Sequence, residues 1–258
     1  SLKKAEKQNS RTFRAGDFGE NITTEGLELH KINLLDRFQC NDVLLEVTQI
    51  GKKCHTGCDI MQQVGSCIMP VEGIFCRVAG TGHLKTGDQM IYLPKKIKAL
   101  VITLSDRAFR GIYKDKSGPF ASKLLKDFFE KGNRPVQIEN TIIPDDEQKL
   151  LKLLEKAAAD KKDIIITTGG TGIGSRDITP EVVKKLLDKE IPGIMELIRV
   201  KYGDEKPGAL LSRSVAGTID KSLVYTLPGS VSAVKEYLAE ITKTLEHSLR
   251  MINDLDVH

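Results

Sequence analysis

Residues 164–172 read Ile164-Ile165-Ile166-Thr167-Thr168-Gly169-Gly170-Thr171-Gly172 and decide the fold of this chain. A short apolar run that leads directly into a glycine-rich turn predicts a buried strand delivering bare backbone N–H groups to a ligand. Such amides form an anion-binding concavity, which suits phosphate. Taken alone, the turn is equally consistent with a tight strand-to-helix connection that binds nothing.

Strand and helix signals alternate on both sides of this stretch. Thr179 as an N-cap followed by Pro180 predicts the start of the next helix. Alternating strands and helices predict an α/β fold: a three-layer, doubly wound, mostly parallel sheet. The other expected elements are strands at 98–104 and 136–143, helices at 120–130, 146–160 and 179–187, a hairpin-like strand pair within 214–226, and a long helix at 230–253.

The first third of the chain has a different character. Strand-like runs at 43–50, 73–78 and 89–93 are separated by recurring glycines, which predicts a small β-barrel or sandwich. The run Pro94-Lys95-Lys96 marks a boundary, so we expect a β-rich domain at 1–94 and an α/β domain at 97–258. All five cysteines fall in the first part: Cys40, Cys54, Cys58, Cys67 and Cys76. An odd number argues against a disulfide framework and for reduced thiols.

Composition excludes several classes of function. The 258 residues carry a formal net charge of +4, with 40% hydrophobic and 29% charged residues, as in ordinary globular proteins. Basic and acidic residues are interleaved, so no nucleic-acid-binding stripe is indicated. No apolar run approaches the ~20 residues that span a bilayer, and no cleavable signal is visible. We expect a cytoplasmic protein that binds neither nucleic acid nor membrane.

Polar and glycine residues follow each predicted strand of the α/β part. Because ligands of such sheets bind beyond the strand carboxyl ends, these loops should share one rim. Asp145 and Asp177 are therefore expected to converge on a metal–phosphate group. Alone, Asp145 would be taken as an N-cap and Asp177 as a turn or capping residue. The loops are Ser105-Asp106-Arg107, Pro144-Asp145-Asp146, Gly169 to Asp177 and Pro228-Gly229-Ser230.

These motifs, with Arg176-Asp177-Ile178-Thr179-Pro180-Glu181 and Leu211-Ser212-Arg213, closely resemble the MogA/MoaB family of molybdenum cofactor biosynthesis over roughly 97–258. The resemblance implies adenylylation of molybdopterin by MgATP, giving adenylyl-molybdopterin and pyrophosphate. It implies that Asp145 and Asp177 are catalytic and hold Mg²⁺. It also implies a homotrimer or an assembly of trimers, with a molybdenum-insertion protein as partner. The implied nucleotide- and pterin-binding residues are Ser105, Asp106, Asp115, Ser117, Gly118, Gly169, Gly170, Thr171, Gly172, Ser212, Arg213, Pro228, Gly229 and Ser230.

The implied chemistry fits what these residue types can do. Attack of a pterin phosphate on the α-phosphorus of ATP brings two anions together, and carboxylate-held Mg²⁺ offsets the repulsion. Positioning and electrostatics should dominate over acid–base chemistry. Arg176, Arg213 and Lys116 are candidates for phosphate contacts, although each could equally be an ordinary solvated charge.

The first part resembles a MOSC domain, the β-rich module of molybdenum cofactor sulfurases. The resemblance rests on residues 16–26, on Val47 to His55 and on Gly73 to Val78, and lacks the strands that normally come first, so the domain is expected to be incomplete at its N-terminus. It implies that Cys54 carries sulfur or touches the cofactor; neighbouring Lys52, Lys53 and His55 favour a thiolate. The alternatives are a buried thiol, or a metal site with Cys58 and Cys67, whose spacing matches neither zinc knuckles nor ferredoxins.

Three functions remain in competition. The leading hypothesis is an adenylyltransferase fused to a MOSC module that binds or hands on the cofactor. The second is a non-catalytic molybdopterin-binding or scaffold protein, against which the retention of both Asp145 and Asp177 argues. The third is a nucleotide-binding α/β domain with another substrate, which predicts ATP consumption independent of pterin.

Overall fold

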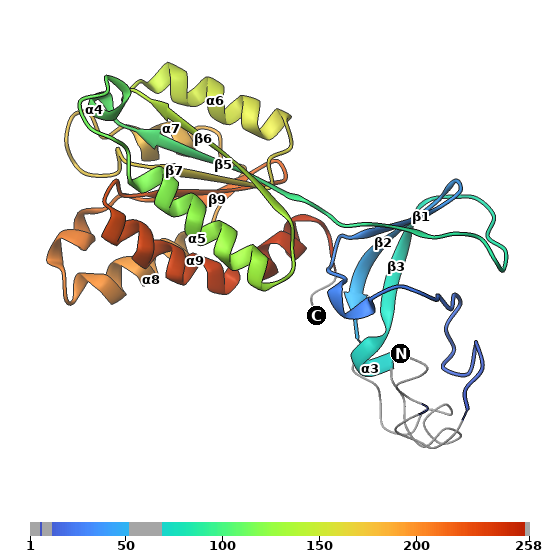
Figure 1. Cartoon of the computed structure of the whole chain (residues 1–258). Coiled ribbons are helices and arrows are strands. Elements are labelled where there is room, and N and C mark those ends of the chain that lie inside the picture. Colours follow the sequence, from blue (N-terminus) through green and yellow to red (C-terminus); the bar gives the residue numbers. More distant parts are fainter. Residues whose placement is uncertain (1–5, 7–11, 52–68, 256–258) are drawn as a thin grey trace. The chain divides into compact units, whose positions relative to one another are not determined.

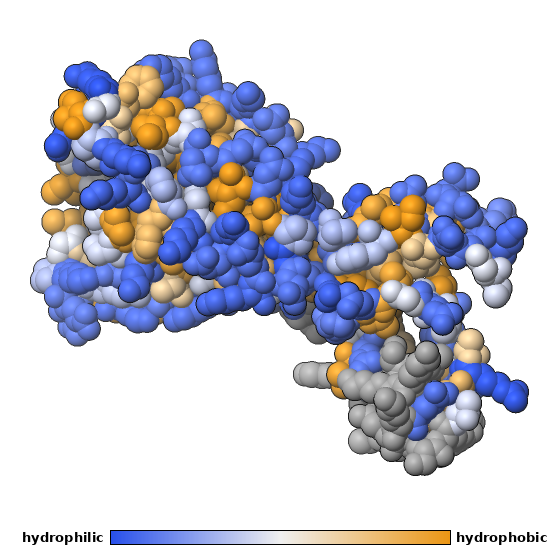
Figure 2. All heavy atoms as spheres, viewed as in Figure 1, coloured by the Kyte–Doolittle hydropathy of each residue, from blue (hydrophilic) through white to orange (hydrophobic). Residues whose placement is uncertain are grey.

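The computed structural model describes residue 6, residues 12–51 and residues 69–255. The chain divides into two compact units, a smaller one within residues 1–95 and a larger one within residues 96–257 (Figure 1). No helix in the described part of the chain is both long and apolar enough to cross a membrane. On the visible face of the larger unit, hydrophilic side chains surround small apolar spots (Figure 2).

The larger unit is built on a six-stranded sheet of order β6-β5-β7-β10-β9-β8. The four strands β6, β5, β7 and β10 are mutually parallel, whereas β9 runs antiparallel to both of its neighbours. The mostly parallel α/β sheet expected from the sequence is confirmed. The strands are β5 (Ile97–Leu104), β6 (Val136–Ile143), β7 (Ile164–Thr168), β8 (Lys189–Glu190), β9 (Ala216–Ile219) and β10 (Ser222–Leu227).

Helices cover both faces of this sheet, which gives three layers (Figure 1). One face packs against α5, α8 and α9, where Leu125 and Phe129 are fully buried. The opposite face packs against α6 and α7 through Leu150, Leu154 and Val182. The helices are α4 (Asp106–Phe109), α5 (Ser117–Lys131), α6 (Glu147–Ala159), α7 (Thr179–Lys184), α8 (Pro192–Gly203), the short 3-10 helix η2 (Pro207–Leu211) and α9 (Val231–Ile252).

Several helices differ from the sequence prediction: α5 begins three residues earlier, α7 ends at Lys184 rather than 187, and α4 was not expected. Thr179 is the first residue of α7 rather than its N-cap, which is Ile178. The Thr179 hydroxyl instead donates to the Gly169 carbonyl oxygen at 2.9 Å. This hydroxyl is therefore hydrogen-bonded to the glycine turn and does not cap the helix. Helix α8 was not predicted from the sequence either. Its buried Met195 and Ile198 alternate with exposed Leu197 and Val200, which blurs the apolar stripe.

The smaller unit contains an antiparallel four-stranded sheet of order β3-β2-β1-β4, as expected of a β-rich module. Glu46 lies on β2 and is paired with Arg37 on β1 and Arg77 on β3, at 2.7 and 2.6 Å. These two ion pairs tie the three strands together. The elements are η1 (Leu29–Lys31), β1 (Arg37–Cys40), β2 (Val43–Ile50), α3 (Met69–Glu72), β3 (Ile74–Gly80) and β4 (Ile91–Leu93).

The two described cysteines of this unit behave as small hydrophobic residues. Cys40 is buried, and Cys76 packs against the core formed by Ile32, Phe38 and Val47. Burial raises the pKa of the Cys76 thiol to about 11. Cys54, the position implied for sulfur chemistry, lies outside the described residues together with its neighbours Lys52, Lys53, His55, Cys58 and Cys67.

Candidate functional site

The loops that carry the predicted site residues leave the sheet at one rim. Strands β5, β6, β7 and β10 are parallel, so their carboxyl ends point the same way. The loop after β7 begins beside the end of β10, because the Gly169 N–H donates to the carbonyl of Leu227, the last residue of β10, at 2.9 Å. A Cβ added to Gly229 would lie 3.4 Å from the Gly169 Cα, an ordinary contact.

In the first part of the glycine loop after β7, Gly169–Gly172, every carbonyl group accepts a hydrogen bond, whereas three successive N–H groups have no acceptor among the described residues. The Gly170 carbonyl accepts from the Thr179 N–H at 3.0 Å, and the Thr171 carbonyl accepts from the Arg213 N–H at 2.9 Å. Within the described residues, the N–H groups of Gly170, Thr171 and Gly172 donate to no protein acceptor. A loop that offers only donors attracts anions.

Backbone geometry explains why glycines occupy the start of this loop. Gly169 has a φ of +96°, and a Cβ there would lie 2.4 Å from the Leu104 carbonyl oxygen. Gly170 has a φ of +64°, and a Cβ there would lie 2.5 Å from the Thr179 hydroxyl. Both positions therefore require glycine for the fold itself.

Asp145 is held against Asp106 by a reciprocal pair of hydrogen bonds. The Asp106 N–H donates to Asp145 Oδ2 at 3.1 Å, and the Asp145 N–H donates to Asp106 Oδ1 at 3.2 Å. Arg176 pairs with the Asp106 carboxylate and donates to the Asp145 carbonyl oxygen at 3.4 Å. These contacts bring the loops after β5, β6 and β7 together.

The pKa of Asp145 lies above the usual range. Burial is the largest cause, and the nearby carboxylates of Asp106 and Asp177 raise the pKa further. The hydrogen bond from the Asp106 N–H and the Arg176 charge oppose the shift. Asp145 and Asp177 therefore share one electrostatic neighbourhood, in which a cation would favour the ionised form of Asp145.

The N-cap alternative for Asp145 is wrong, because Asp146 caps α6 and accepts from the Lys149 N–H at 2.9 Å. The turn role considered for Asp177 is present. Its Oδ2 accepts from the Gly174 N–H at 2.8 Å, and a Cβ added at Gly172 would lie 2.8 Å from the same oxygen. The turn fixes the Asp177 carboxylate beside the glycine loop.

Asp115, Ser117 and Gly118 join α5 to the sheet. Asp115 Oδ1 accepts from the N–H and hydroxyl of Ser117, both at 2.9 Å, and from the Gly118 N–H at 3.3 Å. Its other oxygen accepts from the Thr103 hydroxyl at 2.6 Å. The Ser117 hydroxyl also contacts that of Thr168 at 3.0 Å. This network fastens the start of α5 to β5 and to the last residue of β7.

The predicted serines occupy different local settings. Ser105 is the N-cap of α4 and contacts the Tyr113 hydroxyl at 2.8 Å. Ser230 is the exposed N-cap of α9, directly after the loop of Pro228 and Gly229. Ser212 is buried and hydrogen-bonded to neighbouring hydroxyl groups, including that of Tyr237 at 2.9 Å. Because Ser230 is exposed at this rim of the sheet and Ser212 is buried, Ser230 is the better placed of the two to contact a ligand.

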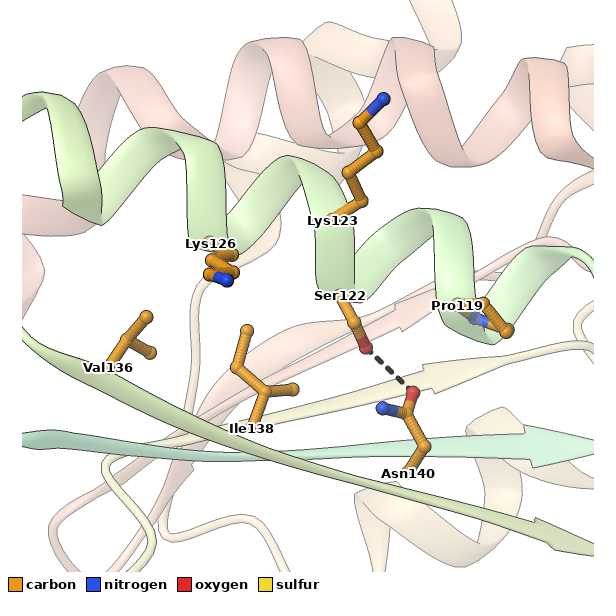
Figure 3. Close-up of a pocket in the computed structure, with 7 residues that line it drawn as sticks. All are labelled: Pro119, Ser122, Lys123, Lys126, Val136, Ile138 and Asn140. Carbon is orange, nitrogen blue, oxygen red and sulfur yellow. Dashed lines mark hydrogen bonds between the residues drawn. The ribbon is translucent and has the colours of Figure 1, made fainter.

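Among the hollows on the described surface of the larger unit, two bear on the site prediction. One, of about 440 Å³, lies between α5 and the edge strand β6 and contains no predicted site residue (Figure 3). In it, Ser122 donates to Asn140 at 2.7 Å. The other, of about 430 Å³, is lined in part by Glu181, Ser212 and Arg213, and so adjoins the glycine loop.

The acidic residues fit a cation that the protein holds together with substrate phosphates better than a cation held by protein side chains alone. Among the described residues, no three His, Cys, Asp or Glu side chains are grouped to hold a metal on their own. Mg²⁺ commonly takes one or two protein carboxylates and completes its shell with water and substrate phosphates. Asp145 and Asp177, near a donor-only loop, fit that arrangement.

Comparison with protein families matches residues 100–247 to a model described as "Probable molybdopterin binding domain". The match spans more than half of the chain. The chain belongs to this family. Residues 1–91 match a second model, that of the MOSC domain. The resemblances to MogA/MoaB and to MOSC predicted from the sequence are thereby confirmed.

Individual members of the molybdopterin-binding family agree with this assignment. Molybdenum cofactor biosynthesis protein B of Staphylococcus carnosus is 41% identical over 156 residues, covering 59% of this chain and 88% of that protein. Molybdopterin adenylyltransferase of Helicobacter pylori is 35% identical over 153 residues, covering 59% and 85%. The crystal structure of the tungsten cofactor synthesizing protein MoaB from Pyrococcus furiosus matches with a TM-score of 0.54 and 37% identity, covering 62% of this chain and 99% of that one. Family membership supports a role in molybdenum cofactor biosynthesis.

Proposed function

We propose that the larger unit adenylylates molybdopterin with MgATP. A terminal phosphate oxygen of the pterin attacks the α-phosphorus of ATP, a new O–P bond forms, the bond between the α-phosphorus and its bridging oxygen breaks, and pyrophosphate leaves. The observation that carries this proposal is the donor-only loop at Gly170–Gly172, with Asp145 and Asp177 in one electrostatic neighbourhood. A triphosphate and its cation need these two kinds of group together.

The chain's own residues would act by positioning and charge. The free N–H groups of Gly170, Thr171 and Gly172 would bind phosphate oxygens. Asp145 and Asp177 would hold Mg²⁺, which when bound neutralises phosphate charge. Because the carboxylates would repel phosphate directly, they serve this reaction only through a cation. Asp106 and Arg176 keep Asp145 in place.

The assay uses the whole chain with molybdopterin and MgATP, and measures pyrophosphate. Pterin-dependent pyrophosphate release that stops when EDTA removes Mg²⁺ is the expected result. Pterin binding without pyrophosphate would identify a scaffold protein, and ATP consumption without pterin would identify a different substrate. Either outcome would overturn the proposal.

Two further parts of the proposal concern assembly and the smaller unit. We propose that residues 97–258 form the adenylylating module, that the chain assembles as a homotrimer or a larger set of trimers, and that it passes its product to a molybdenum-insertion protein. Light scattering tests the assembly.

Residues 1–94 would form the MOSC module and bind cofactor or carry sulfur on Cys54; the match to the MOSC model supports this assignment. Loss of cofactor binding in Cys54→Ala, with adenylylation intact, would test that role.

A further inference from the structure

Arg213 makes an unusually complete set of contacts with the glycine loop. Its Nε donates to the Gly172 carbonyl at 2.5 Å, and its Nη2 donates to the Asp177 carbonyl at 2.6 Å. Its backbone N–H donates to the Thr171 carbonyl at 2.9 Å. Its Nη1 pairs with Glu181 on α7. Each nitrogen of the guanidinium therefore has a protein acceptor.

Apart from the Glu181 carboxylate, the acceptors of Arg213 are carbonyl groups near both ends of the loop. Because the Thr171 and Gly172 carbonyls are bonded to Arg213, the backbone groups that Gly170–Gly172 still offer a ligand are the N–H groups of these three residues. The Asp177 carbonyl is held by Arg213, while its carboxylate is held by the Gly174 N–H at 2.8 Å. A carbonyl shares a peptide plane with the next N–H, so the Arg213 backbone N–H orients the Gly172 amide. The Arg213 side chain occupies the Gly172 and Asp177 carbonyls and so holds the position of Asp177.

We propose that Arg213 is a positioning residue rather than a phosphate ligand, and that it makes the glycine loop a donor-only anion cradle. The role deepens the proposed function and rests on it for the identity of the anion. Lysine keeps the charge of Arg213 but lacks the planar fork of donors, so it cannot reach separate carbonyls at once. A charge role and a positioning role thus predict opposite results for Arg213→Lys.

The control is Arg199→Lys. Arg199 also donates to backbone carbonyls, those of Ser212 at 3.5 Å and Ser214 at 3.1 Å, but makes no contact with the loop. The same chemical change at Arg199 therefore leaves the bonds from the Arg213 side chain to the loop carbonyls in place. Glu181→Gln is a milder second variant, since it removes one partner of the guanidinium and leaves the loop carbonyls bonded.

The first readout needs no turnover. Trypsin cleaves after Arg176, which is exposed within the loop, and the next residue is the one whose carbonyl Arg213 holds. We expect cleavage between Arg176 and Asp177, followed by mass spectrometry, to be at least about tenfold faster in Arg213→Lys. Arg199→Lys should cleave as the parent does, and Glu181→Gln should lie between. If Arg213→Lys does not fold, the cleavage rate of Glu181→Gln is compared with that of Arg199→Lys. Faster cleavage in Glu181→Gln supports the proposal, and equal rates overturn it.

The second readout is binding of inorganic pyrophosphate by calorimetry. Weaker binding in Arg213→Lys despite the retained charge supports the proposal. Parent-like cleavage together with parent-like pyrophosphate binding in Arg213→Lys would overturn it. Both measurements remain interpretable if the parent chain releases no pyrophosphate from ATP, so failure of the proposed function is distinguishable from failure of this role.

Discussion

Gly169→Ala tests how tightly the glycine loop is built onto the sheet. The substitution places a side chain at a φ of +96°, which costs roughly 1–2 kcal/mol for an L-residue. The new Cβ would also lie 2.4 Å from the Leu104 carbonyl oxygen. That oxygen belongs to a central strand and cannot rotate away, so overpacking adds about 1–3 kcal/mol. We expect the free energy of unfolding of the larger unit to fall by about 2–5 kcal/mol in total.

Gly111→Ala is the matched control. Gly111 has a φ of +72°, and a Cβ there would meet nothing within 4 Å, so the backbone strain remains and the clash does not. Urea unfolding followed by far-UV circular dichroism gives the free energy of unfolding of each variant. The signal reports the larger unit, because the long helices α5, α6, α8 and α9 all lie in it. Gly169→Ala should be the more destabilising by about 1–3 kcal/mol. Equal losses in the two variants would refute the close approach of the loop to Leu104.

Two further predictions follow from shifted pKa values. Burial and the neighbouring carboxylates raise the pKa of Asp145 in the folded chain. The folded chain is therefore stabilised when Asp145 is protonated, and this stability is lost as the pH rises through the raised pKa. Asp145→Asn should therefore unfold at higher urea than the parent at about pH 7, with the gap closing towards about pH 3; no gap at neutral pH contradicts this. Burial raises the pKa of Cys76 from 9.0 to about 11, so iodoacetamide should label it about 100-fold more slowly in the folded than in the urea-unfolded chain. Comparable labelling rates by peptide mass spectrometry would be the contrary result.

The sequence predicted those parts of the fold that depend on strong local patterns. Strand β6 was expected at its observed bounds, and α6 was expected one residue too long at each end, since Asp146 and Asp160 are its caps. Helix α9 was found because Val234, Leu238 and Leu245 recur at helical spacing and are all buried. Helix α8 was missed because its exposed Leu197 and Val200 disguise the buried stripe.

The candidate site was predicted in its chemistry more than in its contacts. The glycine loop and the two acidic positions follow from residue type and from parallel-sheet topology. The reciprocal bonds between Asp106 and Asp145 join residues 39 positions apart, and the bond from Arg213 to Gly172 spans 41. Side-chain choices at such separations depend on how loops meet in space, which no local pattern encodes. The sequence therefore predicted Arg213 as a phosphate contact or a solvated charge, and not as a partner of the loop carbonyls.

The central claim is that Asp145 and Asp177 act on one cation–phosphate group at the glycine loop. Its most direct test is the rate of pterin-dependent pyrophosphate release in Asp145→Asn and Asp177→Asn, with Asp146→Asn as the control. Asp146 caps α6, and asparagine caps a helix equally well, so this control should keep the parent rate. Each of the other two variants should lose at least about 10²-fold while remaining folded. Near-parent rates in both would contradict the account.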